Sequence, residues 1–286
     1  MRYESPTTTK DAVALLAKEK GVARVLAGGT DLMVQLRMGM VEPDLVVDIK
    51  RIPVMAEIKE LASGFKIGSG VSCAELGEHK KFKKAWPGVV EAANLIGSDQ
   101  IQGRCTIAGN LCNASPAADS VPALVAAGAK AVIAGKTKKR TVPIEEVPAG
   151  PGATSLKKGE LVESISLPKR PKNSGDAYLR FIPRTEMDIA VVSAGVNLTL
   201  EKGVIKSARV ALGAVAPTVL LVQAAADAII GTKLDDDALE ALAKACSKAC
   251  KPIDDKRGTK EYRIKVAGVL AKRAANIAFE RAGGKK

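Results

Sequence analysis

The sequence predicts an α+β protein built from three consecutive segments, approximately residues 1–53, 54–172 and 173–286. The first segment alternates helical and strand patterns. The second consists of short strands and turns with two helices inserted, and the third begins with two strands and ends in helices. A chain of 286 residues, 47% of them hydrophobic, is long enough to build apolar cores for one large domain or for two to three small ones.

The first segment is expected to place a glycine-rich turn between a strand and a helix. Thr8 or Thr9 is a suitable N-cap for a first helix that runs to Lys20, where Gly21 ends it. Pro43 excludes a continuation of the second helix. The elements expected after the first helix are a strand at 23–26, a helix at 32–38 and a strand at 45–49.

Beyond residue 52 the pattern changes to short strands. Lys169 to Gly175, rich in Pro, Lys and Gly, is the expected linker to the third segment. That segment should open with an antiparallel pair of strands. The expected elements are strands at 65–70, 130–133, 141–144, 160–167, 189–200 and 205–214, and helices at 87–95, 221–230, 235–250 and 259–281.

The chain carries a large positive charge that does not by itself indicate a function. The formal net charge of +13 suits a nucleic acid, an acidic protein partner or an anionic cofactor. Nucleic-acid binding is the competing interpretation. However, aromatic residues make up only 3% of the chain and the basic residues are dispersed along it, without a nucleic-acid-binding signature. The densest cluster, Lys136 to Arg140, is typical of a solvated turn between strands.

The cysteine and histidine content argues against a disulfide framework and against a metal site. Five scattered cysteines are an odd number. Cys246 and Cys250 lie four apart on an expected helix, which is also core spacing, and His79 is the only histidine. We therefore expect no metal ligand and no catalytic residue. The lack of a signal-like start and of a long apolar run predicts a cytoplasmic protein without a membrane span.

The first candidate binding element is Ala27-Gly28-Gly29-Thr30-Asp31, where a strand passes into a helix. Two adjacent glycines allow a tight turn and let backbone N–H groups approach an anion without an intervening Cβ. The stretch is neither the G-x-G-x-x-G of a Rossmann-type fold nor the G-x-x-x-x-G-K-[ST] of a P-loop. By itself, a Gly-Gly pair after a strand is compatible with an ordinary turn.

The second candidate element is the stretch from Gln100 to Ser120, which is rich in small, hydroxyl and amide side chains. Small residues with free hydrogen-bonding groups suit a surface that wraps a polar, elongated ligand. Its composition is equally compatible with a structural loop. Cys105 and Cys112 lie inside this stretch and are expected to line the wall of any such site.

Together the two elements resemble the FAD-binding medium subunits of the xanthine dehydrogenase and carbon monoxide dehydrogenase family. A-G-G-T-D-L is followed, about seventy residues later, by T-I-x-G-N-x-x-x-x-x-P-x-x-D, and Phe181 to Ala190 resembles the family's F-x-x-R-x-x-x-D-I-A segment. Order, spacing and length agree over essentially the whole chain. The resemblance implies a two-subdomain FAD-binding fold of the vanillyl-alcohol-oxidase (PCMH) type, followed by a smaller α+β C-terminal domain.

The resemblance also implies roles for individual residues. The residues expected to hold the FAD pyrophosphate through backbone groups are Ala27, Gly28, Gly29, Thr30 and Asp31, with Leu32 closing the loop. Those expected to contact the diphosphate and ribityl region from the other side are Thr106, Gly109, Asn110 and Asn113. Asp119 is expected to accept hydrogen bonds from the ribose hydroxyls, and Arg180 to approach the flavin, where its charge would favour an anionic reduced ring.

Structural alternatives and departures from the family pattern remain. Asp119 could also cap a helix that begins near Ser120, a role that can coincide with ligand binding, and Arg184 and Asp188 could form a surface ion pair. The family commonly has Gly-Gly where this chain has Ala108-Gly109, so Ala108 must keep a negative φ or tolerate crowding near the phosphates. An Asn-Gly-like pair is common where this chain has Gly103 and Cys105. The cysteine-rich insertion of members that reduce aromatic acyl-CoA compounds is absent from this sequence, so its iron–sulfur cluster is not expected.

For a molybdenum hydroxylase, the lack of metal ligands in this chain implies that the molybdenum site and the iron–sulfur centres lie on other chains. The resemblance implies an electron-transfer subunit in a heterotrimer, alone or dimerised, with a large molybdenum-cofactor subunit and a small 2Fe–2S subunit. Electrons would reach FAD and pass to NAD, a quinone or oxygen. The alternatives are a stand-alone FAD oxidoreductase, which one histidine and three tyrosines make a poor fit, and a basic nucleic-acid-binding protein, which leaves the glycine stretches unexplained.

Overall fold

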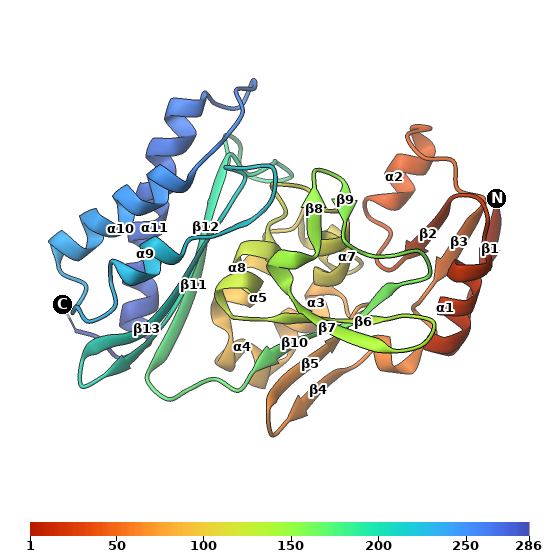
Figure 1. The fold of residues 1–286 in the computed structure, drawn as a ribbon, viewed down its shortest axis with the longest axis horizontal. Helices are drawn as coiled ribbons and strands as arrows, with labels where there is room; N and C mark the ends of the chain where they lie inside the picture. Colours follow the sequence, from red (N-terminus) through yellow and green to blue (C-terminus); the bar gives the residue numbers. More distant parts are fainter. Residues whose placement is uncertain (286) are drawn as a thin grey trace.

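The structure is a computed structural model that describes residues 1–285 and contains three main sheets in chain order (Figure 1). The first sheet is parallel, in the order β1-β3-β2. Thr8 caps the first helix by accepting a hydrogen bond from the backbone N–H of Asp11, as the sequence predicts. The elements of this part are β1 (Arg2–Glu4), α1 (Thr9–Lys18), β2 (Ala23–Leu26), α2 (Leu32–Arg37) and β3 (Leu45–Asp48).

The second sheet is antiparallel, in the order β4-β5-β10-β6-β7, and short helices lie between its strands. Its strands are β4 (Ile58–Leu61), β5 (Gly64–Gly68), β6 (Lys130–Ala134), β7 (Lys139–Pro143) and β10 (Leu161–Pro168), and a small hairpin is formed by β8 (Pro148–Gly150) and β9 (Ala153–Thr154). The helices are η1 (Pro53–Met55), α3 (Cys73–Glu78), α4 (Lys80–Ala85), α5 (Pro87–Ala93), α6 (Asp99–Gln102), α7 (Ile107–Cys112), α8 (Ser120–Ala126) and η2 (Ile144–Glu146).

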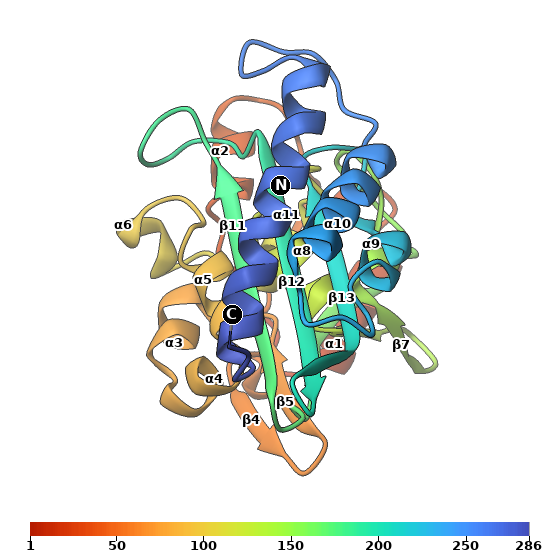
Figure 2. The ribbon, with the colours of Figure 1, turned by 90° about the vertical axis from the view of Figure 1, so that its left-hand side faces the viewer.

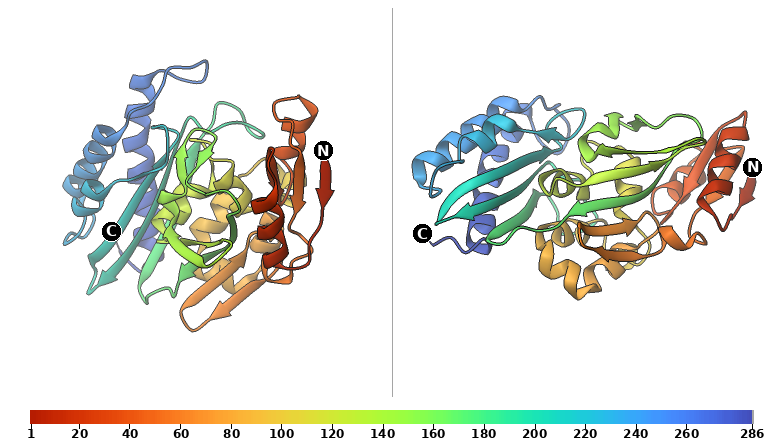
Figure 3. Two further views of the ribbon diagram at one scale, coloured as in Figure 1. Left: turned by 45° about the vertical axis from the view of Figure 1, so that its right-hand side comes forward. Right: turned by 60° about the horizontal axis from the view of Figure 1, so that its bottom comes forward.

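The third sheet is also antiparallel, in the order β11-β12-β13-β14, and is covered on one face by the two longest helices (Figure 2). Its opposite face meets α5 and α8, so the C-terminal part packs directly on the second part (Figure 3). The elements are β11 (Ser174–Phe181), β12 (Val192–Glu201), β13 (Val204–Gly213), β14 (Leu220–Leu221), α9 (Gln223–Asp227), α10 (Asp236–Ala249) and α11 (Lys260–Arg281).

Three clusters of buried apolar side chains hold these parts together. The cluster beneath the first sheet includes Ala134 and Leu161, which belong to strands of the second sheet. The first segment therefore completes its core with side chains of the second. Among residues 1–285, no helix combines the length and the apolar character needed to cross a membrane.

Most predicted strands and long helices are confirmed to within a few residues, but several elements were not predicted. β11 is missing from the prediction because Gly175 and Asp176 are unfavourable in strands; its pairing with β12 over eight residues overrides that preference. The predicted linker is fixed rather than loose, since the Arg170 guanidinium lies 4.7 Å from the Trp86 ring and pairs with Asp176 at 2.7 Å. Six α-helices, not two, lie between β5 and β6, because helices of four to seven residues leave little periodic signal.

Candidate functional site

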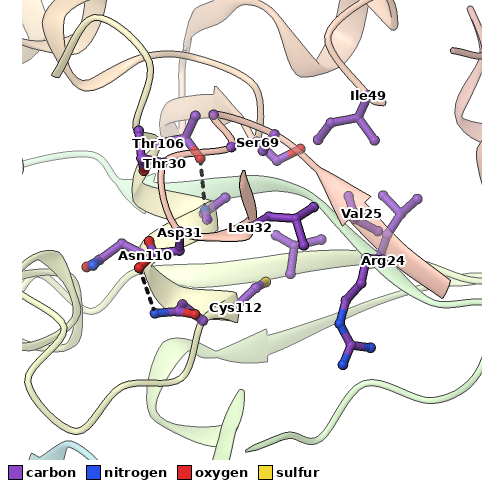
Figure 4. Close-up of a pocket in the computed structure, with 18 of the residues that line it drawn as sticks. Arg24, Val25, Thr30, Asp31, Leu32, Ile49, Ser69, Thr106, Asn110 and Cys112 are labelled. Carbon is purple, nitrogen blue, oxygen red and sulfur yellow. Dashed lines mark hydrogen bonds between the residues drawn. The ribbon is translucent and has the colours of Figure 1, made fainter. Parts of the chain in front are cut away.

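A cavity of about 560 Å³ lies between the first two sheets, within the size range of small-molecule sites (Figure 4). Both glycine-containing motifs contribute to its wall, although about eighty residues separate them in the sequence. Cys105 and Cys112 line it, as predicted. The motif residues in the lining are Ala27, Gly28, Gly29, Thr30, Asp31, Leu32, Thr106, Gly109, Asn110 and Asn113.

The glycine pair fits the turn between β2 and α2 for two different reasons. At Gly28 a Cβ would come within 2.1 Å of the Arg104 carbonyl oxygen, so only glycine permits this contact between the loop and the backbone before α7. Gly29 has a φ of +80°, which an L side chain rarely adopts. The loop at residues 28–29 therefore packs directly against the Arg104 backbone, and this close contact requires glycine.

This loop presents a row of unused backbone donors. Within the described chain, the N–H groups of Gly28, Gly29, Thr30, Asp31 and Leu32 find no backbone or side-chain acceptor. The first helical bonds, from Met33 to Gly29 and from Gln35 to Asp31, form only after them. Consecutive unpaired N–H groups beside a cavity form a site for an anion such as a phosphate.

The second motif forms a short helix, α7, on the opposite wall of the cavity. Thr106 caps it, with its Oγ1 accepting from the Gly109 N–H at 2.8 Å. Asn110 accepts from the hydroxyl of Ser120 at 2.7 Å, which turns its carbonyl oxygen away from the cavity; among the described residues its amide Nδ2 has no acceptor. Ala108 keeps a negative φ inside α7, so the departure from Gly-Gly is accommodated without backbone strain.

Side chains of the two motifs meet across the cavity. Asn113 donates from Nδ2 to the Asp31 carboxylate at 3.3 Å and accepts from Nε2 of Gln35 at 3.3 Å. This chain of hydrogen bonds ties α2 to the end of α7. Gln35 was not singled out in the sequence, although its i+4 position from Asp31 on a helix could have indicated it.

The cavity holds little positive charge. Arg24 is the only basic residue in the lining of the described chain, and of the two acidic residues there Glu160 is already paired with Arg140 at 2.8 Å. Desolvation raises the pKa of the other, Asp31. The net charge of +13 is therefore not concentrated in this cavity, and an anion there would be held by backbone donors rather than by lysines or arginines.

One buried hydroxyl points to a missing polar partner. Ser69 is only 3% exposed, lines the cavity, and its Oγ has no hydrogen-bond partner within residues 1–285. Leaving such a group unpaired is costly, so a ligand with polar groups fits here. The remaining wall is mostly apolar and includes residues that no sequence motif marked, among them Val25, Ile49, Ile96, Leu161 and Val162.

Asp119 and Arg180 form a separate cluster at the junction with the C-terminal part, outside this cavity lining. Arg180 Nη1 donates to Asp119 at 2.8 Å, and the Tyr178 hydroxyl donates to the same carboxylate at 3.2 Å. Burial raises the pKa of Asp119, and the charge of Arg180 only partly offsets this. Asp119 occupies the N-cap position of α8, which begins at Ser120 as expected, but its side chain makes no capping hydrogen bond.

The remaining sequence candidates have structural partners. The Arg184–Asp188 ion pair is confirmed, with Nε and Oδ2 3.1 Å apart, and it lowers the pKa of Asp188 to about 2. His79 accepts a hydrogen bond from the Phe82 N–H at the start of α4. Cys246 and Cys250 are both buried in the core of the C-terminal part. Within residues 1–285, no group of three or more His, Cys, Asp or Glu residues is placed to hold a metal ion.

Comparisons with known proteins match this arrangement over the whole chain. Residues 1–170 match the family described as the FAD binding domain in molybdopterin dehydrogenase. Residues 177–278 match the CO dehydrogenase flavoprotein C-terminal domain. The chain belongs to the family of FAD-binding medium subunits of molybdenum hydroxylases.

Individual relatives cover nearly the full length of this medium subunit. It is 31% identical to the carbon monoxide dehydrogenase medium chain of Hydrogenophaga pseudoflava, covering 98% of this chain and 97% of that one. It is 30% identical to a putative xanthine dehydrogenase FAD-binding subunit of Escherichia coli (strain K12), covering 99% and 97%. A chain of reconstituted CO dehydrogenase from Oligotropha carboxidovorans superposes with a TM-score of 0.94 at 33% identity, with 98% of each chain covered.

FAD is the cofactor of this family, and the cavity of the medium subunit fits it. The unpaired N–H groups after Ala27 suit the pyrophosphate, the unpartnered Ser69 hydroxyl suits a polar group of the ligand, and the apolar strands suit an aromatic ring. The predicted α+β fold class, the oxidoreductase family and the FAD cofactor are thus all supported by these matches.

Proposed function

We propose that this medium subunit carries electrons from iron–sulfur clusters of a partner subunit to an external acceptor such as NAD, a quinone or oxygen. Its FAD supplies the electron-transfer chemistry, while the chain binds and orients it. The observation that carries the proposal is the meeting of the two motifs around one cavity, tied by the Asp31–Asn113–Gln35 hydrogen bonds. No His or Tyr lines that cavity in the described chain, which disfavours a stand-alone oxidoreductase needing its own proton-transfer residue.

The proposed contacts follow the sequence motifs. Backbone groups of residues 27–32 hold the pyrophosphate, and the residues Thr106, Gly109, Asn110 and Asn113 bind the diphosphate and ribityl region from the other wall. We propose that, from the junction with the C-terminal part, Asp119 accepts from ribose hydroxyls of the adenosine and Arg180 approaches the flavin. Segments 1–53, 54–172 and 173–286 are proposed as the two FAD-binding subdomains and the C-terminal domain.

The proposed partners are a large molybdenum-cofactor subunit and a small 2Fe–2S subunit. Relatives named medium chain and FAD-binding subunit are parts of larger assemblies. This chain is about equally similar to carbon monoxide and xanthine dehydrogenase subunits, so its sequence does not favour either substrate, and we propose that the large subunit determines it. A cytoplasmic location is proposed because all five cysteines are free thiols.

One exposed apolar patch supports the subunit role. Met33 and Val34 on α2, with Met38 and Met40 after it, are 48–70% exposed, and no residue of α2 is buried. Such clustered exposure is uncommon unless a partner covers it. Because Leu32 and Met40 also line the cavity, the patch adjoins the cofactor site, and the subunit that donates electrons must lie close to it. We assign this α2 patch to the small iron–sulfur subunit.

The decisive experiment is reconstitution of the purified full chain with FAD. Flavin absorption at about one FAD per chain is the expected result, and folded protein without flavin bands would contradict the proposal. For the partner, a double charge substitution, Met33→Lys with Val34→Lys, should abolish co-purification with the small subunit while the chain keeps its FAD. Ile230→Lys, at an exposed apolar position outside the patch, is the matched control. Unchanged co-purification of the double variant would remove the assignment of the patch.

A further inference from the structure

Two cysteines from separate segments lie side by side behind the glycine loop. Cys73 begins α3, and its backbone N–H donates to the carbonyl oxygen of Cys105 at 2.8 Å. This 2.8 Å backbone contact keeps the two Cα atoms within the separations that a disulfide spans.

The pair has an unequal reactivity. Both residues are shielded from bulk solvent, but Cys105 lines the cavity and can be reached from it. The neighbouring Cys73 side chain lowers the pKa of Cys105, whereas Cys105 and burial raise the pKa of Cys73. Since the thiolate is the reactive form, Cys105 is the nucleophile and Cys73 the resolving thiol.

The position of Cys105 couples this pair to the proposed phosphate loop. A Cβ built on Gly28 would lie 2.1 Å from the Arg104 carbonyl oxygen and 2.9 Å from the Cys105 Cα, so the two backbone segments have no space between them. A disulfide that rotates Cys105 toward α3 must shift this backbone. Gly28 and the N–H groups beside it would then move away from the positions that suit an anion.

We propose that Cys73 and Cys105 form a reversible disulfide in the FAD-free chain, with hydrogen peroxide as oxidant, and that this disulfide weakens FAD binding. The Cys105 thiolate attacks peroxide, the O–O bond breaks, and Cys105 becomes a sulfenic acid as one water leaves. Cys73 then attacks that sulfur, the S–S bond forms and the S–O bond breaks, releasing a second water. Two thiols and one peroxide give one disulfide and two waters, and a dithiol reductant reverses the reaction.

Binding linkage gives this proposal a second consequence, which rests on the proposed use of the cavity by FAD. If the disulfide weakens FAD binding, FAD must oppose the disulfide by the same factor. FAD would also cover the route to Cys105. The disulfide would thus form mainly in chains without FAD, and these chains would bind FAD weakly until the disulfide is reduced.

The test uses the full chain stripped of FAD. Peroxide treatment is expected to remove two free thiols, to yield a Cys73–Cys105 cross-linked peptide in mass spectra, and to weaken FAD binding about tenfold. Dithiothreitol should restore the affinity, and saturating FAD should slow the cross-link. Absence of the cross-linked peptide, or a cross-linked chain with unchanged FAD affinity, would overturn the inference. A reduced chain that fails to bind FAD would instead contradict the proposed function.

Two variants separate the pair from its surroundings. Cys73→Ser should lose the peroxide effect on FAD affinity that dithiothreitol reverses. Cys250→Ser is the matched control, because Cys250 lies in the C-terminal core outside the cavity lining, and burial raises the pKa of its thiol to about 11. It should behave as the unsubstituted chain does. If Cys73→Ser does not fold, the peptide map of the unsubstituted chain still decides the question.

Discussion

The cavity between the first two sheets and the Asp119 cluster at the C-terminal junction are built in opposite ways. The cavity presents backbone donors from residues 28–32 and holds a single basic residue in its described lining. The cluster consists of side chains, with Arg180 and Tyr178 both donating to one buried carboxylate. The cavity should therefore tolerate substitutions that change charge but not substitutions that change its shape. The Asp119 cluster should tolerate changes of shape better than changes of charge.

The largest effect is expected from a shape change in the cavity. Gly28→Val places side-chain carbons into the Arg104 carbonyl and should weaken FAD binding about a hundredfold, equivalent to about 2.7 kcal/mol. Fluorescence titration of FAD measures this. Gly103→Ala is the control, because a Cβ there meets its nearest neighbour only at 3.8 Å. Equal FAD affinity in both variants would mean that the close packing of Gly28 against Arg104 does not matter for FAD binding.

A charge change in the cluster should mainly affect folding. Asp119→Ala leaves the buried Arg180 guanidinium without its carboxylate and should lower the free energy of unfolding by about 2 kcal/mol. Urea denaturation of the FAD-free chain measures this, with Asp119→Asn as the milder variant that keeps an acceptor. The proposed contact of Asp119 with a ribose hydroxyl predicts a loss of FAD affinity as well, but unchanged stability would break the comparison, because the carboxylate would then matter only for the ligand.

The pH dependence of stability sharpens the contrast between two buried carboxylates. The pKa of Asp119 is higher in the folded chain than in the unfolded chain. Its contribution to the free energy of unfolding is therefore present below the pKa of the unfolded state and is lost as pH rises through the pKa of the folded state. Glu163, on β10, is buried too, but Lys139 and Lys66 outweigh its desolvation and lower its pKa. The contribution of Glu163 to the free energy of unfolding is therefore present above the pKa of the unfolded state and is lost as pH falls through the pKa of the folded state.

These signs can be measured as differences from the neutral variants. Between acid and neutral pH, the stability of the unsubstituted chain relative to Asp119→Asn should fall with rising pH, whereas relative to Glu163→Gln it should rise. Urea titrations at a series of pH values give both slopes. If the stability difference had the same sign of slope against pH for both residues, Arg180 would stabilise the ionised form of Asp119 as fully as the two lysines stabilise that of Glu163.

The smallest effect is expected from the unpartnered hydroxyl in the cavity. Ser69→Ala removes no hydrogen bond of the described chain, so stability should be unchanged, while FAD affinity should fall about threefold to tenfold if Ser69 bonds the cofactor. Ser164→Ala is the control, because that hydroxyl is likewise buried and unpartnered but lies outside the cavity lining. Equal FAD affinity in both variants would leave the Ser69 hydroxyl without a ligand role.

The secondary structure was predictable where an element had a long hydrophobic pattern or a clear capping residue at its end. β2 was predicted to the residue, and α10 and α11 were predicted to within one residue at each end because Asp235 and Thr259 are good N-caps. β11 and the helices α3, α4, α6 and α7 were missed. Their sequences are short or contain strand breakers, and only packing against distant partners stabilises them.

The candidate site shows the same division. The glycine loop and the Thr106 segment could be predicted because their requirement is local: a turn without a Cβ and a short capped helix. Ser69, Gln35 and Leu161 could not, since each reaches the cavity only through the arrangement of separate sheets and helices. The pairing of Asp119 with Arg180 joins residues sixty-one positions apart, and no local pattern records it.

The sequence by itself determined the family, the FAD cofactor and the two motifs, because these depend on ordered residue types at fixed spacing. The tertiary structure decided which donors remain free, which carboxylate is already paired, and that Cys73 lies against Cys105. Those facts depend on three-dimensional neighbours, and burial and hydrogen bonding change the chemistry of a side chain only once its neighbours are in place.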